Sequence, residues 1–188
     1  MKIGKTFYAA NRRTWRSWLV AHYKKENEVW LIYYKKSTGK PRIPYNDAVE
    51  EALCFGWIDS TAKAIDDERF AQRFTPRRRG SRLSQMNKER IRKLILEKRM
   101  TAAGLAAVSH VFNADSPDDF SIATDILDAI RTDENVWKNF QLFPERYKRI
   151  RIGYIESQRS HSHEAFQKSL TNFIKKTAKN KKFGLIRD

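Results

Sequence analysis

Apolar residues recur along most of this chain at the spacings that distinguish helices from strands. Residues 11–24 place two tryptophans, a leucine and a histidine at i, i+3, i+4 and i+7, which predicts an amphipathic helix. Residues 28–35 are rich in β-branched and aromatic types and predict a mostly buried strand. A turn is expected next, because Gly39 accepts positive φ and Pro41 cannot continue a strand ladder.

The following segment predicts a second helix and two more strands. Alanines and a phenylalanine at helical spacing indicate a helix over residues 44–55, and Asn46 or Asp47 is expected to cap its start. Residues 57–65 and 69–75 predict two strands joined by an acidic turn. With the strand at 28–35, they suggest a small antiparallel sheet.

The remainder of the chain predicts helices only. They run from Ser84 or Asn87 to about Arg99, over 101–112, 122–130 and 136–143, and from Pro144 and Ser162 onward. The Ser-Pro-Asp-Asp sequence at 116–119 resembles an N-terminal capping arrangement. The helix from Pro144 is expected to bury Tyr147, Ile150, Tyr154 and Ile155.

These elements predict an α+β fold, with a small antiparallel sheet packed with helices in the N-terminal half and an all-helical C-terminal half. The length of 188 residues favours a single domain. Within it we distinguish an α+β half at 1–100, a helical half at 101–178 and a basic tail at 179–188.

The net charge of +16 is large for this length and indicates an anionic partner. Positive charge is concentrated in residues 1–42, 69–99 and 146–188, which are separated by two acidic stretches, 43–68 and 100–145. The single cysteine excludes an internal disulfide. With no secretory signal and no apolar run of about 18–20 residues, the sequence predicts a cytoplasmic protein without a membrane span.

Several motifs between residues 28 and 107 occur in an order typical of one family. The longest is EALCFGWID at 51–59, and the others include VWL at 29–31, TGKP at 38–41, RFTPR at 73–77 and AGLAA at 103–107. On these motifs the chain resembles the YdeI/OmpD-associated (bacteriocin-protection) family. The resemblance implies a link to resistance against antimicrobial peptides and, through the family name alone, association with a porin. It implies no reaction and no catalytic residue.

The chain departs from that family's pattern at two places. Leu83 stands where the family usually has tryptophan, and residues 157–163 keep only Arg159 of a basic C-terminal signature. A direct role in capturing cationic peptides also conflicts with the positive charge of this chain, because like charges repel.

Three side-chain types deserve comparison as candidates for chemistry. Cys54 lies near a predicted helix C-terminus, where the helix dipole disfavours a thiolate, so we interpret it as a packing residue. Glu50 and Glu51 offer paired carboxylates for acid–base chemistry, or simply pair with basic residues at the surface. The pair His161 and His163 has no third ligand of suitable spacing, so no metal site is predicted.

The strongest signal for a partner is a basic and aromatic region that runs from a strand edge, through the loop PRRRGSRLS, to a helix N-terminus. Arginine forks bind phosphate or carboxylate, and a helix N-terminus adds free N–H donors. We therefore predict a site for an anionic group among the hairpin at 35–41, the turn at 54–59 and the segment 73–87. Its expected residues are Lys36, Trp57, Asp59, Arg73, Arg77, Ser84 and Asn87.

Each of these residues has an expected role. Lys36, Arg73 and Arg77 would hold the anion, Trp57 would stack on the ligand, and Asp59 would orient it. Asn87 would share the orienting role, beside Ser84 at the helix start. Asp59 has an equally simple alternative, in which its carboxylate caps the local backbone.

The sequence thus predicts a non-enzymatic binding or stress-protection protein for an anionic ligand, with no cofactor, metal or catalytic residue. One alternative is nonspecific binding to the nucleic-acid backbone, which requires contiguous positive potential and strong salt dependence. Another is a small-molecule enzyme, which requires a concave pocket and a perturbed carboxylate near Asp59.

Overall fold

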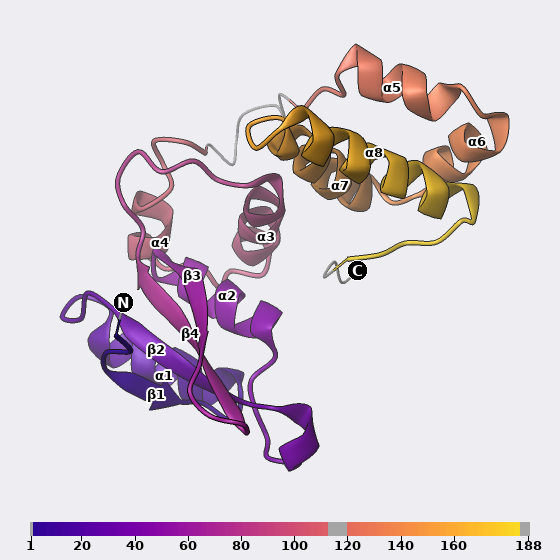
Figure 1. The fold of residues 1–188 in the computed structure, drawn as a ribbon. Helices are drawn as coiled ribbons and strands as arrows, with labels where there is room; N and C mark the ends of the chain where they lie inside the picture. The colour runs from indigo at the N-terminus through magenta and orange to yellow at the C-terminus, as the bar shows by residue number, and fades with distance from the viewer. Residues whose placement is uncertain (1, 113–119, 185–188) are drawn as a thin grey trace. The chain divides into compact units, whose positions relative to one another are not determined.

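The computed structural model describes residues 2–112 and 120–184. These form two compact units, each considered by itself: an N-terminal unit of residues 2–82 and 90–112, and a C-terminal unit of residues 83–89 and 120–184. The N-terminal unit combines a sheet with helices, and from residue 124 onward the described chain contains helices only, so the predicted α+β class is confirmed (Figure 1).

The sheet of the N-terminal unit has four strands in the order β1-β2-β4-β3. Their bounds are Thr6–Tyr8 for β1, Val29–Tyr34 for β2, Trp57–Ala64 for β3 and Arg69–Pro76 for β4. The last three are the predicted strands, and they pair antiparallel. The three-residue β1 was not predicted. It pairs parallel to β2 and makes the sheet mixed.

Two helices, α1 (Arg12–His22) and α2 (Tyr45–Cys54), pack with the sheet around an aromatic core. The ring centroid of Trp15 on α1 lies 5.3 Å from that of Phe74 on β4, and the Trp15 indole donates a 3.0 Å hydrogen bond to the carbonyl of Ala48. The indole thus buries a large apolar surface without leaving its N–H unpaired.

The two ends of α2 are built differently. Pro44 is the N-cap residue and no side chain caps the helix, so the predicted capping by Asn46 or Asp47 is wrong. Proline has no backbone N–H that would need an acceptor, and its ring fixes φ at the entry to the helix. At the other end, Gly56 takes φ of +76°, a conformation that glycine adopts without strain.

A helix distant in sequence seals this C-terminal end of α2. It is α4 (Ala102–Ala106), shorter than the predicted 101–112. The hydroxyl of Thr101 donates a 2.6 Å hydrogen bond to the carbonyl of Cys54. A Cβ on Gly104 would lie 2.3 Å from the same carbonyl oxygen, so only glycine permits this approach.

Two further elements complete the part of the chain up to residue 112. Lys36–Thr38 forms the short 3-10 helix η1 within the predicted turn, ending at Gly39 with φ of +66°. Gln85–Leu96 forms α3, and the Ser84 hydroxyl accepts a 3.3 Å hydrogen bond from the Asn87 backbone, as expected for the start of a helix.

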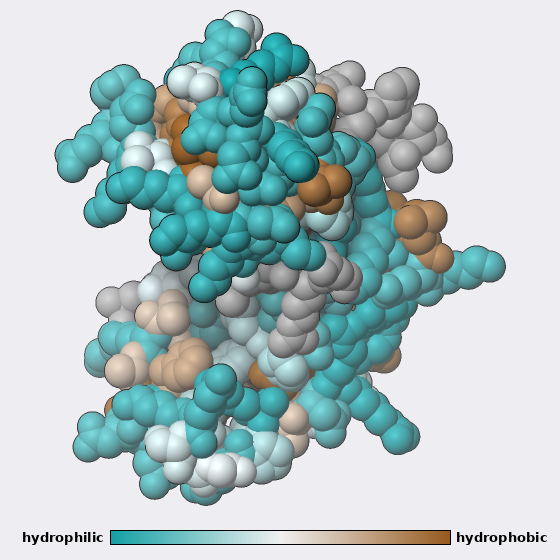
Figure 2. All heavy atoms as spheres, turned by 90° about the vertical axis from the view of Figure 1, so that its right-hand side faces the viewer, coloured by the Kyte–Doolittle hydropathy of each residue, from teal (hydrophilic) through white to brown (hydrophobic). Residues whose placement is uncertain are grey.

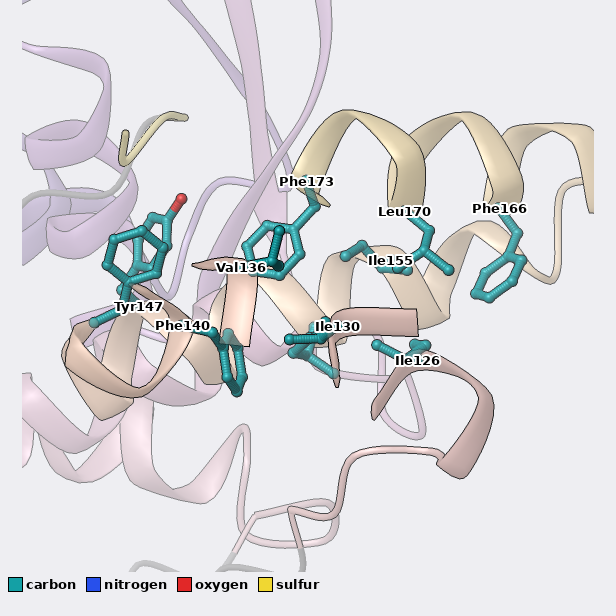
Figure 3. Close-up of a cluster of buried hydrophobic side chains, with 11 residues drawn as sticks. Ile126, Ile130, Val136, Phe140, Tyr147, Ile155, Phe166, Leu170 and Phe173 are labelled. Carbon is teal, nitrogen blue, oxygen red and sulfur yellow. The ribbon is translucent and has the colours of Figure 1, made fainter. Parts of the chain in front are cut away.

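Four helices lie wholly within the described part of the C-terminal unit: α5 (Thr124–Arg131), α6 (Glu134–Leu142), α7 (Glu145–Gln158) and α8 (His163–Ala178). Asp133 caps α6 and Ser162 caps α8. Isoleucines and phenylalanines from all four helices form one buried cluster (Figure 3). The capping arrangement predicted at 116–119 lies outside the described residues.

The surface is largely polar. Hydrophilic residues cover most of the face drawn in Figure 2, where hydrophobic residues form small separate areas. Among the described residues, no helix is long and apolar enough to cross a bilayer. The same residues contain no group of three or more histidines, cysteines or carboxylates that would hold a metal ion.

Candidate functional site

The residues of the predicted site differ in burial and are divided between the two units. Trp57 is only 1% exposed and donates a hydrogen bond of 3.2 Å to the carbonyl of Tyr23, so it belongs to the core and has no free face for stacking. Ser84 and Asn87 lie at the start of α3, within residues counted with the C-terminal unit. Lys36 is exposed on η1.

Arg73, one of the arginines of the predicted site, already has a carboxylate partner. The guanidinium of Arg73 binds the carboxylate of Glu28 through Nε at 2.8 Å and Nη2 at 2.6 Å. Sequence patterns could not reveal this pair, because the residues lie 45 positions apart. Both nitrogens bind the same oxygen, Oε2, so an anion would have to compete with this ion pair at Arg73.

Asp59 is held by a tyrosine. The hydroxyl of Tyr45 donates a 2.6 Å hydrogen bond to Oδ2 of Asp59. Burial and this hydrogen bond both raise the pKa of Tyr45 above its ordinary value. Nearby, the Tyr33 hydroxyl is buried without a hydrogen-bond partner among the described residues, and burial raises its pKa as well.

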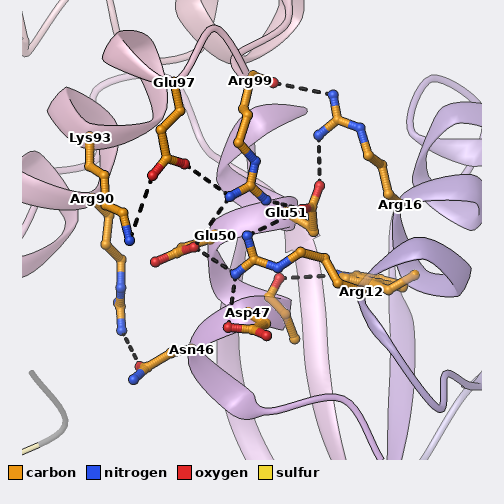
Figure 4. Close-up of polar contacts among 12 residues, drawn as sticks. Arg12, Arg16, Asn46, Asp47, Glu50, Glu51, Arg90, Lys93, Glu97 and Arg99 are labelled. Atoms are coloured by element: carbon orange, nitrogen blue, oxygen red, sulfur yellow. Dashed lines mark hydrogen bonds and ion pairs between the residues drawn. The ribbon is translucent and has the colours of Figure 1, made fainter. Parts of the chain in front are cut away.

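Glu50 and Glu51 occupy the centre of a buried ion network, the Glu51 network. Glu51 is only 1% exposed. The residues around it come from three places in the fold: Arg12 and Arg16 on α1, Asp47 and Glu50 on α2, and Arg99 after α3 (Figure 4). Glu50 and Glu51 thus pair with basic residues, which was one of the two sequence-based alternatives. The two carboxylates are buried, however, and do not lie at the surface.

The distances within this network indicate strong, charge-assisted bonds. Arg16 donates to Glu51 at 2.7 Å and Arg12 to Glu50 at 2.7 Å, while Arg99 donates to the other oxygen of Glu51. Burial lowers the pKa of Arg12, but its hydrogen bonds with Glu50 and Asp47 outweigh that effect and raise it. Both carboxylates are committed to structure, which leaves neither as a free acid or base.

Cys54 lies beside the Glu51 network and is fully buried. Burial, followed by the negative charge of Glu51, raises the pKa of its thiol to about 11. The thiol is therefore protonated near neutral pH, which agrees with its interpretation as a packing residue.

The basic loop, residues 77–82, is the part of the predicted region that keeps free cations. The Nη2 atom of Arg77 donates to the carbonyl and hydroxyl of Ser81, both at 3.0 Å, and to the carbonyl of Arg82 at 3.2 Å. The backbone N–H of Gly80 donates a 2.8 Å hydrogen bond to Nε2 of His110. Arg77 therefore serves to order the loop.

Three exposed arginines of the basic loop differ from Arg73. Arg78, Arg79 and Arg82 have no hydrogen bond or ion pair through their guanidinium groups within the described chain. Arg77 also has no carboxylate partner there, and burial lowers its pKa. The loop thus presents uncompensated positive charge on a backbone fixed by its own hydrogen bonds.

A pocket on the N-terminal unit is lined by none of the predicted residues. It measures about 500 Å³ and borders α1 and β1, with Phe7, Trp18 and His22 among its lining residues. The imidazole of His22 stacks on Trp18 at 4.7 Å between centroids. The helical spacing of Trp18 and His22 in the sequence predicts an amphipathic helix and gives no sign of a pocket.

The N-terminal part of the chain matches a known family of domains. Residues 7–107 match the model of a family described as a domain of unknown function, DUF8412. The chain belongs to this family. The DUF8412 match covers β2, α2, the Glu51 network and the basic loop, and it extends beyond half of the 188 residues.

The DUF8412 match corrects the resemblance drawn from the sequence motifs. The assignment to the YdeI/OmpD-associated family is wrong, and the motifs at 51–59 and 73–77 belong to a DUF8412 domain. The links to antimicrobial-peptide resistance and to a porin rested on that assignment and fall with it. No curated protein and no solved structure matches the chain.

Proposed function

We propose that the DUF8412 domain of this protein, residues 7–107, is a non-enzymatic binding module for phosphate-bearing polyanions. The basic loop is its contact surface. The nucleic-acid backbone is the polyanion we select for testing. The observation that supports the proposal is the contrast between two sets of arginines. Arg73 is paired with Glu28, whereas the arginines of the basic loop have no carboxylate partner among the described residues.

This contrast matters because an anion binds a free guanidinium without first breaking an ion pair. Arginine offers a planar fork that matches two phosphate oxygens, and each contact releases counterions from a polyanion. Arg78 and Arg79 are adjacent, and Arg82 follows after one turn, at which the Ser81 N–H bonds the Arg78 carbonyl at 3.1 Å. An extended polyanion engages such neighbouring, exposed side chains better than a small anion does.

The order of the loop also favours binding. Arg77 and His110 hold the loop backbone through hydrogen bonds, so less conformational entropy is lost when a ligand arrives. The proposed contacts are between the loop arginines and the phosphate groups of the nucleic acid. We therefore expect little sequence preference and a strong dependence on salt.

The test is a titration of the full chain against a fluorescent 20-base-pair DNA duplex of mixed sequence. Binding is measured by anisotropy at several salt concentrations, starting at about 50 mM. The variant R78Q/R79Q/R82Q should bind more weakly and reduce the slope of log K against log salt by about 2 to 3, since each phosphate contact contributes about 0.9.

A variant with the same loss of charge provides the control. K175Q/K179Q/K181Q removes three exposed lysines at the end of α8 and beyond. Its slope should stay close to that of the unaltered chain. If the chain does not bind at about 50 mM salt, or if both triple variants lose the same slope, the basic loop is not a polyanion site.

A further inference from the structure

A buried arginine in the C-terminal unit has no counterpart in the chemistry described so far. Arg151 lies on α7, four residues after Tyr147 and four before Ile155, and is only 8% exposed. Both of those neighbours belong to the apolar core of the unit. Taking a guanidinium out of water costs free energy unless other groups replace the water.

Within the described residues, the guanidinium of Arg151 forms no hydrogen bond and no ion pair, and its Nε atom is buried without a partner. Burial lowers its pKa, and the groups that act against this effect are Tyr147 and Tyr154, not a described carboxylate. Aromatic rings replace part of the lost hydration instead. The guanidinium carbon lies 4.0 Å from the ring centroid of Phe183 and 5.1 Å from that of Tyr154.

Arg159, at the end of the same helix, has a different environment. Arg159, two turns further along α7, binds Asp125 at 2.7 Å and Glu156 at 2.8 Å. Among the described residues, the exposed Arg159 therefore has carboxylate partners, whereas the buried Arg151 has none. Such an arrangement is costly for stability, and it is typical of sites that await a charged ligand.

The unpaired guanidinium borders a pocket of about 390 Å³ between α7 and α8, a size within the range of about 300–1,000 Å³ that holds small ligands. α7 contributes Arg151, Tyr154 and Gln158 at i, i+3 and i+7, and α8 contributes Lys168, Ser169 and Asn172. Each of these six side chains carries a hydrogen-bond donor. All lining residues that the structure describes are neutral or basic.

We propose that the pocket formed by Arg151 and Lys168 binds a small organic phosphate. Two cations match the charge of a phosphate monoester, which is about −1.5 to −2 at pH 7, whereas a carboxylate would leave one of them uncompensated. The guanidinium fork receives two phosphate oxygens, and Ser169 and Asn172 donate to the others. Tyr154 and Phe183 provide an apolar wall for the organic part of the ligand.

This site is separate from the proposed polyanion function, since it involves other residues and a compact ligand. The test is isothermal titration of the full chain with phenyl phosphate, inorganic phosphate and benzoate. Phenyl phosphate should bind most tightly, because it combines the dianion with an aromatic ring. Benzoate, with one negative charge, should bind at least about tenfold more weakly.

Three variants assign the binding to this pocket. Arg151→Met keeps the length of the side chain and removes the charge, so it should abolish binding without lowering the melting temperature. Lys168→Gln, at an exposed position, should weaken binding by about tenfold or more. Lys175→Gln, on α8 but outside the pocket lining, should bind like the unaltered chain.

Several results would overturn the proposal. These are the absence of saturable binding by both phosphates, equal affinity for benzoate, and unchanged affinity in Lys168→Gln. Loss of thermal stability in Arg151→Met would likewise show that the charge serves the fold. The loop variant R78Q/R79Q/R82Q should retain phenyl phosphate binding, and its failure in DNA binding alone would leave this site intact.

Discussion

Arg16 joins three segments of the DUF8412 unit through one guanidinium. Its Nη1 atom donates to Glu51 on α2 at 2.7 Å, and its Nη2 atom donates to the backbone carbonyl of Arg99 at 3.2 Å. Glu51 in turn accepts from the side chain of Arg99. Helix α1, helix α2 and the segment after α3 are thus linked by one buried carboxylate and two partly exposed arginines.

Glu51→Gln should be strongly destabilising. The substitution keeps the shape of the side chain but leaves Arg16 and Arg99 without their shared carboxylate, and breaking a buried pair in this way costs about 3–5 kcal/mol. Urea unfolding followed by circular dichroism measures the loss. Glu97→Gln removes another carboxylate of Arg99, but a more exposed one, and should cost no more than about 1 kcal/mol. Equal losses would contradict the buried role of Glu51.

Gly104→Ala should destabilise the contact between α4 and the end of α2. The new Cβ would lie 2.3 Å from the carbonyl oxygen of Cys54 and 2.9 Å from that of Leu53, and backbone atoms cannot move aside cheaply. We expect a loss of about 2–3 kcal/mol or more in the free energy of unfolding. Ala102→Ser, at an exposed position of the same helix, is the control and should change stability by about 0.5 kcal/mol or less.

Cys54 should make the protein sensitive to alkaline pH. Because burial raises the pKa of the folded thiol from 9.0 to about 11, the unfolded chain loses this proton first as pH rises. The stabilising contribution is therefore complete below pH 9 and is lost as pH rises toward 11. Between pH 8 and 11 the unaltered protein should lose about 2 kcal/mol more than Cys54→Ala.

Urea midpoints at intervals across this pH range measure the effect. A pH profile that is parallel for the two proteins would show that the thiol does not titrate differently in the folded and unfolded states.

Tyr33→Phe should leave stability unchanged or raise it by about 1 kcal/mol, since the hydroxyl it removes is buried without a partner among the described residues. The matched comparison is Tyr147→Phe. That hydroxyl accepts a 3.2 Å hydrogen bond from the backbone N–H of Phe183, and its loss should cost about 1 kcal/mol. Thermal unfolding of both variants distinguishes them. A clear destabilisation by Tyr33→Phe would reveal a partner for its hydroxyl.

Arg77→Gln should loosen the basic loop while leaving its exposed arginines in place. The three hydrogen bonds from Nη2 to Ser81 and Arg82 would be lost, and trypsin, which cleaves after arginine, should then cut the loop faster. DNA binding should weaken although Arg78, Arg79 and Arg82 remain. Unchanged digestion would show that the loop is held by other contacts.

The sequence predicted the strands and helices whose cause is local. The aromatic and β-branched run at 28–35 became β2, and the tryptophans at helical spacing became the buried face of α1. The strand β1 could not be predicted, because three residues carry little pattern and its parallel pairing with β2 is not local. The α7 pattern was misjudged in one respect: Tyr154, expected inside, is 50% exposed, and Arg151 is buried.

The candidate sites were harder to predict than the fold. Counting charges along the chain identified the basic region correctly as a place with many arginines. It could not show that Arg73 forms an ion pair with Glu28, 45 residues away. Nor could it show that Arg77 donates hydrogen bonds to its own loop. The pocket at Arg151 depends on two helices packing side by side, so neither stripe of residues indicates a site alone.

The Glu51 network contains three arginines and three carboxylates, so it contributes nothing to the net charge of the protein. The net charge of +16 is therefore carried by the other residues, many of them exposed. Dissolved ions screen exposed charges within about 8–10 Å at moderate ionic strength but reach buried ones poorly. Salt should therefore weaken the binding of anionic partners by the exposed arginines more than it weakens the contacts of the buried Glu51 carboxylate.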